Sequence, residues 1–142
     1  ENDLDPLNSQ TVESINSNPS IIPAGFKNDV RPYLAIANVL VFPSYREGFP
    51  NVVMQAGGMG LPSIVSDING CNEIIIEQEN GLIIPVKDEM AIFLAMKKMV
   101  TNSSLTSKMK DNSRQMIVSR YEQKVVWEAI LSEYRTFESP NV

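Results

Sequence analysis

Three short, mainly apolar runs stand out along the chain, at residues 39–42, 63–65 and 82–84. Each is too short for a helix and shows no apolar–polar alternation, which is typical of a strand covered on both faces. Ile21 and Ile22 predict a further short strand ahead of them, although Pro23 cannot donate a ladder hydrogen bond.

The rest of the chain has the periodicity and punctuation of helices. Helices begin at favoured N-cap residues, Asn8 or Ser9, Asp88, and Asn102 or Ser103. The predicted helices cover residues 8–15, 30–37, 51–59, 71–76, 88–100, 103–120 and 123–137.

Strands that alternate with helices predict an α/β fold, a Rossmann-like parallel sheet flanked by helices. We expect one partial domain over residues 1–137 and a tail at 138–142. In such sheets, ligands bind outside the carboxyl ends of the strands. Loop 43–50, which follows the first of the three runs, is therefore the expected ligand site.

Composition narrows the chemistry. A net charge of −5 argues against nucleic-acid binding, which needs a basic surface. The chain has no histidine and one cysteine, Cys71, so a zinc site and Ser-His-Asp chemistry are both unexpected. Cys71 is interpreted as a buried small hydrophobic residue rather than a nucleophile. With no signal peptide visible, a cytoplasmic protein is expected.

The first residues are Glu-Asn-Asp without an initiator Met, and a helix is the first predicted element. We therefore expect a piece of a longer protein, cut at the N-terminal edge of its sheet. That edge would expose an unpaired strand.

Residues 48–52 lead from a strand into a helix, whose first N–H groups and dipole favour an anion such as a phosphate. Gly48 lets a ligand approach the backbone, Pro50 presets the helix entry, and Asn51 and Val52 have N–H groups to offer. A plain strand-to-helix turn is the simpler interpretation of these residues alone.

Glu47 in the loop and Gln55 in the helix can reach one ligand, although two isolated surface polar groups are the simpler interpretation. Gly57 and Gly58 each weaken the same helix by about 1 kcal/mol relative to Ala. Close packing against the sheet is the expected reason for these two glycines.

Several short motifs in order resemble the donor-binding half of the retaining, metal-independent GT-B enzymes called glycosyltransferases group 1. The resemblance runs from about residue 18 to the final helix and is specific as an ordered set. Its motifs are residues 24–26 with Asp29, 41–44, 46–53, 60–62, 66–67, 69–70, 72–73, and 79–83 with Pro85.

The resemblance implies roles for Glu47 and Gln55. Glu47 matches the first Glu of the family's Glu-x7-Glu motif, which lies against the hydroxyls of the donor sugar near the anomeric carbon. The second Glu, which holds the ribose hydroxyls, is replaced here by Gln55. An amide pairs with two hydroxyls less strongly than a carboxylate, so donor binding is expected to be weaker by roughly 1–2 kcal/mol.

The resemblance also implies that the amides of Phe49, Asn51 and Val52 meet the sugar and diphosphate. Phe26 and Lys27 match the segment near the nucleobase. The cations that neutralise the leaving diphosphate, and the N-terminal domain that binds the acceptor, would lie upstream of residue 1. This chain alone is therefore expected to be inactive.

The resemblance thus implies a glycosyltransferase that needs no cofactor or metal and takes a nucleoside-diphosphate sugar such as a UDP-sugar. Its acceptor would be a saccharide or a lipid-linked glycan of capsule or lipopolysaccharide assembly, reached at the inner face of the cell membrane. Two alternatives stay open: a nucleotide-sugar epimerase on the same fold, and a non-catalytic module that binds sugar nucleotides or proteins.

Overall fold

The computed structural model describes residues 7–138. The chain divides into two units, Glu1–Val30 and Arg31–Val142. In the first unit, helix α1 (Ser9–Ser17) begins where the Asn8 side chain accepts a hydrogen bond from the N–H of Thr11 at 2.7 Å. The strand predicted at Ile21 and Ile22 is wrong. No strand forms at these two residues, and the Ile22 side chain is 86% exposed because nothing in the described part of this unit pairs with it.

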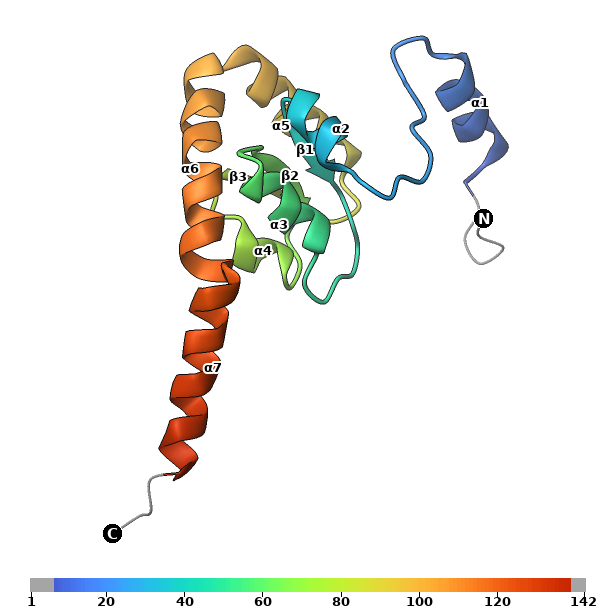
Figure 1. Cartoon of the computed structure of the whole chain (residues 1–142). Helices are drawn as coiled ribbons and strands as arrows, with labels where there is room; N and C mark the ends of the chain where they lie inside the picture. Colours follow the sequence, from blue (N-terminus) through green and yellow to red (C-terminus); the bar gives the residue numbers. More distant parts are fainter. Residues whose placement is uncertain (1–6, 139–142) are drawn as a thin grey trace. The chain divides into compact units, whose positions relative to one another are not determined.

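The second unit alternates strands with helices, as predicted, and Figure 1 shows the order along the chain. Its elements are α2 (Arg31–Ile36), β1 (Leu40–Phe42), α3 (Asn51–Gly58), β2 (Ser63–Ser66), α4 (Cys71–Ile74), β3 (Gly81–Ile84), α5 (Glu89–Thr101), α6 (Ser103–Tyr121) and α7 (Gln123–Glu138).

The three strands form a parallel sheet in the order β1-β2-β3. Val41 pairs with Ile64, and Ile64 pairs with Leu82, so all three strands end at the same edge. β2 is buried throughout, whereas β1 is only half-buried. Leu40 and Phe42 pack against one core and Val41 against the other, so the predicted cover of both faces is present but incomplete.

Successive residues of β2 face opposite sides of the sheet and belong to two separate cores. Val65 packs with residues of α3, α4 and α6, among them Val53 and Ile74. Ile64 packs with residues of β3, α5 and α6, among them Met99 and Met109. Helices therefore cover both faces of the sheet, which is the predicted arrangement.

The two glycines of α3 do not pack against the sheet, so that expectation is corrected. A β-carbon on Gly57 would lie 2.6 Å from the Ile117 side chain, so Gly57 lets α3 approach α6 closely. A β-carbon on Gly58 would meet nothing within 4 Å.

The motif Glu79-Asn80-Gly81 is structural. The buried Asn80 side chain accepts a hydrogen bond from the N–H of Ile76 at 2.7 Å and donates to the carbonyl of Ile74 at 3.1 Å. The Glu79 carboxylate pairs with Lys108 at 2.7 Å, which ties this turn to α6. These contacts fix the entry into β3.

The predicted apolar face of the last helix is present but uncovered in the described structure. Val126, Ile130, Tyr134 and Phe137 are between 39% and 77% exposed. α7 packs against the end of α6 and extends away from the sheet (Figure 1). The division at residue 138 stays a prediction, because residues 1–6 and 139–142 lie outside the described part of the chain. None of the helices in the described residues is long and apolar enough to cross a bilayer.

Candidate functional site

The carboxyl ends of the three strands open into two neighbouring hollows. One, of about 290 Å³, is lined by Tyr45, Arg46, Glu47, Ile68 and Asn69. The other, of about 250 Å³, also includes Tyr45 and is lined by Pro43, Ser66, Pro85, Lys87, Asp88, Glu89 and Ile92. The predicted loop therefore borders a crevice at the edge where ligands bind in parallel sheets.

Glu47 is held in place at the rim of the first hollow. It is half-buried, and its Oε1 atom accepts a hydrogen bond from the Ser44 hydroxyl at 2.7 Å. This bond orients the carboxylate within the turn that follows β1. One carboxylate oxygen and the remaining lone pairs stay open to a ligand's hydroxyl groups.

The loop enters α3 without a side-chain cap. Pro50 is the N-cap residue and makes no side-chain hydrogen bond to the first turn, while its carbonyl accepts from the N–H of Val53 at 3.1 Å. The first-turn N–H groups of Asn51 and Val52 are therefore not satisfied by a capping side chain. Such groups, aligned with the helix dipole, favour an anion.

Gln55 lies on α3, one turn after Asn51, and its side chain is exposed. Gly48 and Phe49 are exposed as well, the Phe49 ring by 40%. Of the predicted residues from Glu47 to Gln55, Glu47 lines a hollow, and the others follow it along the loop and the first turns of α3. Their contact with a donor stays a prediction. Phe26 and Lys27 belong to the first unit, which is described by itself, so their place beside a nucleobase stays a prediction.

Cys71 follows the crevice loops but is no nucleophile. Its side chain is fully buried, as predicted. Burial, and after it the negative charge of Glu47, raise the pKa of the Cys71 thiol to about 11. The thiol is therefore protonated at neutral pH, and a thiolate is the reactive form.

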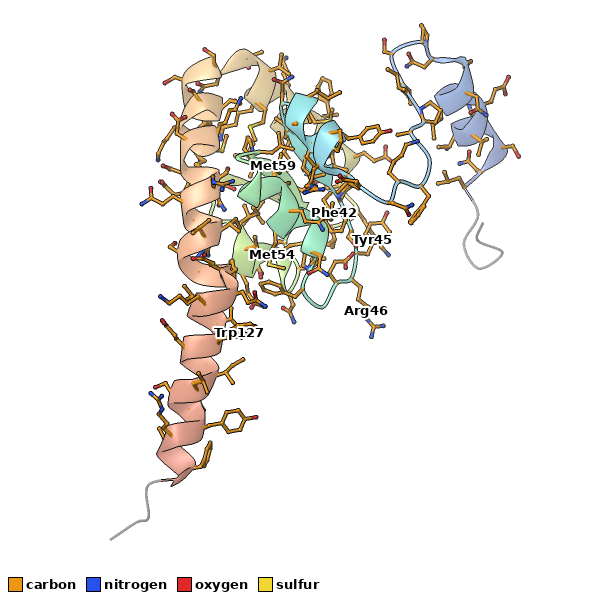
Figure 2. The ribbon with its side chains drawn as sticks, viewed as in Figure 1. Phe42, Tyr45, Arg46, Met54, Met59 and Trp127 are labelled. Carbon is orange, nitrogen blue, oxygen red and sulfur yellow. The ribbon has the colours of Figure 1, made fainter. Side chains whose placement is uncertain are left out.

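Some residues of the site were not predicted. The Lys87 ammonium lies 5.4 Å from the centre of the Tyr45 ring and joins the loops after β1 and β3. Figure 2 shows Arg46 projecting from its loop away from the sheet. Gly70, at the start of α4, lies directly against the carbonyl of Gly48. The sequence gives no sign of these contacts, because Lys87, Tyr45 and Gly70 lie in separate loops.

The comparisons with known proteins agree on the protein family. Residues 3–102 match the family described as glycosyl transferases group 1. The chain is 28% identical over 123 residues to the capsular polysaccharide biosynthesis glycosyltransferase CapM of Staphylococcus aureus, covering 87% of this chain and 32% of CapM.

The chain is also 33% identical over 120 residues to the UDP-Gal:alpha-D-GlcNAc-diphosphoundecaprenol alpha-1,3-galactosyltransferase of Escherichia coli, covering 84% of this chain and 30% of that enzyme. This chain therefore spans about a third of the length of the curated relatives it matches.

Solved structures share the fold. HepE of Anabaena, in complex with UDP-glucose, superposes with a TM-score of 0.80 at 16% identity, over 89% of this chain and 35% of HepE. Sucrose-phosphate synthase of Thermosynechococcus elongatus superposes with a TM-score of 0.69 at 27% identity, over 76% of this chain and 27% of the synthase. The predicted α/β fold of the GT-B type is confirmed. Because the family match covers most of its residues, the chain belongs to the glycosyl transferases group 1 family.

Proposed function

We propose that this chain forms the donor-binding part of an enzyme that transfers a sugar from a nucleoside-diphosphate sugar to a polysaccharide or glycolipid acceptor. The observation that carries the proposal is the position of Glu47. This carboxylate, oriented by Ser44, borders a hollow beside an uncapped helix N-terminus at the ligand-binding edge of the sheet. Family membership adds independent support.

In the proposed mechanism, Glu47 is the catalytic residue. Its carboxylate accepts hydrogen bonds from the donor sugar and stabilises the positive charge that develops at the anomeric carbon. The leaving diphosphate meets the amides of Gly48, Phe49, Asn51 and Val52, with Pro50 shaping the entry into α3. Preorganised donors at the position where charge develops lower the barrier without reorganisation.

Gln55 would bind the ribose hydroxyls from α3, and Phe26 and Lys27 would lie near the base. The transfer is proposed to retain the anomeric configuration and to need no metal or other cofactor. The remaining cations and the acceptor site would come from an N-terminal domain of the whole enzyme, acting in the cytoplasm at the membrane surface. This chain by itself is proposed to be inactive.

The names of relatives support the class of donor and acceptor. CapM is named for capsular polysaccharide biosynthesis, the Escherichia coli enzyme for a UDP-galactose donor and a diphosphoundecaprenol-linked acceptor. HepE was solved with UDP-glucose. We therefore propose a UDP-sugar as the first donor to try and a lipid-linked saccharide as the first acceptor.

The proposal is tested on the full-length enzyme by measuring nucleoside diphosphate release with UDP-, GDP- and ADP-sugars in the presence of lipid-linked acceptors. Glu47→Ala is expected to lower turnover by about a hundredfold or more. Glu128→Ala on α7, which removes an acid that is 67% exposed, is the matched control and should leave turnover unchanged.

Retention of activity within about threefold in Glu47→Ala would contradict the assignment of this residue, since a group that stabilises the transition state contributes about a hundredfold or more. Donor binding without turnover, restored to turnover by Gln55→Glu, would instead support a non-catalytic module. Conversion of the donor into a different sugar nucleotide, without an acceptor and without release of nucleoside diphosphate, would support an epimerase.

A further inference from the structure

The loop of the proposed site is anchored by an aromatic contact with a distant helix. The ring of Phe49 meets the ring of Tyr121, at the C-terminal end of α6, with 5.3 Å between centroids and 66° between planes. This edge-to-face geometry is the favourable one for aromatic pairs. Phe49 is two residues after Glu47 and two before Asn51, so the contact acts at the middle of the loop.

Tyr121 is itself fixed by hydrogen bonds. Its hydroxyl donates to the carbonyl of Glu73 at 2.9 Å. The neighbouring Arg120 guanidinium lies 4.9 Å from the Tyr121 ring centre and donates to the carbonyls of Glu73 at 3.0 Å and Ile74 at 2.6 Å. These carbonyls end the one-turn helix α4, so the end of α6 holds both the ring and α4 in place.

The other end of α4 supports the same loop. The N–H of Gly70 donates to the Glu73 carboxylate at 3.1 Å, and Gly70 packs against the carbonyl of Gly48. Gly48 has no side chain to anchor the loop, and a β-carbon there would meet nothing within 4 Å. Between Glu47 and α3, the loop is therefore anchored by the buried Pro50 and by the contact of the Phe49 ring with Tyr121.

We propose that Tyr121 is a positioning residue for the loop that carries Glu47 and leads to the first turn of α3. Its ring holds Phe49 and so fixes the backbone of the loop, which carries the Glu47 carboxylate and the N–H groups that act on the donor. The consequence for turnover rests on the proposed function. Catalytic groups must be held within about half an ångström of their productive geometry by residues that are themselves locked.

The test compares Tyr121→Leu, Phe49→Leu, the double variant and Tyr121→Phe in the full-length protein. Tyr121→Leu removes the ring, Tyr121→Phe keeps the ring and removes the hydroxyl, and Tyr134→Leu on exposed α7 is the matched control. Amide hydrogen exchange is followed by mass spectrometry in peptides over 44–54 and, as a reference for global unfolding, over β2. The kcat and KM for the donor are measured in parallel.

Both single variants are expected to speed exchange over 44–54, with β2 unchanged, and to lower kcat/KM for the donor by about tenfold, the size expected for loss of one aromatic pair. The double variant should lose no more than the single ones because both remove the same contact. Tyr121→Phe should recover most of the loss, and Tyr134→Leu should behave like the unaltered protein.

If Tyr121→Leu speeds exchange in β2 as well, that variant destabilises the whole fold, and the proposal is then tested on Phe49→Leu. This variant truncates a side chain that is 40% exposed and spares the core. Unchanged exchange over 44–54 in Phe49→Leu would overturn the proposal. Unchanged kcat/KM despite faster exchange, or losses that multiply in the double variant, would overturn it too.

If the proposed function is wrong, the experiments give a different result. An unaltered full-length protein that neither binds nor turns over sugar nucleotides would refute the donor site. The exchange measurements would then still show whether Tyr121 positions the loop, because they need no substrate.

Discussion

Gly70 and the carbonyl of Gly48 are in such close contact that a β-carbon on Gly70 would collide with the Gly48 oxygen. Gly70 also has a φ of 78°, in the left-handed region that favours glycine. Two separate loops, one after β1 and one after β2, thus meet at a point where no side chain fits. The position of the Glu47 loop depends on this contact as well as on Phe49.

Gly70→Ala is therefore expected to destabilise the protein more than the same substitution at a left-handed glycine with open space around it. We expect a decrease of about 3 kcal/mol or more in the free energy of unfolding, from backbone strain plus the collision. Donor affinity should fall as the loop is displaced. Urea unfolding and donor titration of the full-length protein measure the two effects.

Gly60→Ala is the matched control. Gly60 has the same φ of 78°, but a β-carbon there would meet nothing within 4 Å. It should cost about 1 kcal/mol in stability, from strain alone, and leave donor affinity unchanged. Equal losses in the two variants would show that the contact with Gly48 does not matter.

The Cys71 thiol should be unreactive in the native protein. Because it is fully buried and its pKa is raised to about 11, alkylation at mildly alkaline pH should be much slower in native protein than in protein unfolded in urea. Mass spectrometry of the modified peptide measures both rates. Similar rates in the two states would contradict the burial of this side chain.

The same shift predicts a pH dependence of stability. The folded thiol keeps its proton up to a higher pH than the unfolded thiol, whose pKa is near the ordinary 9.0. Its contribution is thus complete below pH 9.0 and is lost as the pH rises towards about 11. Over this range, the free energy of unfolding should fall more steeply in the unaltered protein than in Cys71→Ala; parallel curves would exclude the effect.

Gln55→Glu should strengthen donor binding if the side chain meets the ribose. A carboxylate can accept hydrogen bonds from both ribose hydroxyls, and we expect tighter binding by roughly 1–2 kcal/mol, or about fivefold to thirtyfold. Calorimetric titration with the best-binding nucleotide measures the change. Gln115→Glu, on the exposed surface of α6, makes the same charge change elsewhere and should have no effect.

Equal affinity in Gln55→Glu and the unaltered protein would mean that Gln55 does not contact the nucleotide. Weaker binding in Gln55→Glu would place the side chain near the diphosphate, where a second negative charge is unfavourable.

Asn80→Ala should weaken folding without changing the site. It removes the acceptor of the Ile76 N–H and a donor to the Ile74 carbonyl, and a loss of about 1–3 kcal/mol in the free energy of unfolding is expected. Asn112→Ala, whose partly buried amide donates to the Glu79 carbonyl at 3.1 Å, should lose less. The opposite order of stability in urea would contradict the structural role of Asn80.

Much of the second unit follows from local sequence. The apolar run at Ile64 and Val65 predicted a buried strand, and Asp88 and Asn102 predicted where α5 and α6 begin. The Asp88 carboxylate accepts from the N–H of Ala91 at 2.8 Å, as an N-cap should. Each of these signals lies within one short segment of the chain.

The features that sequence could not predict depend on distant partners. Ile21 and Ile22 have strand-like side chains but form no strand, because a strand needs a neighbour. Gly57 packs against Ile117 of α6 rather than the sheet, and Phe49 meets Tyr121. The sequence motif around Glu47 predicted which loop to examine, but it did not predict the contacts that hold this loop.

A sugar-nucleotide site at the Glu47 loop can be detected by NMR titration of the isotope-labelled full-length protein with UDP, GDP and ADP and their sugar derivatives. With one of these bases, we expect chemical-shift changes confined to residues 26–27 and 47–55. No response to any nucleotide, or changes confined to other parts of the chain, would contradict it.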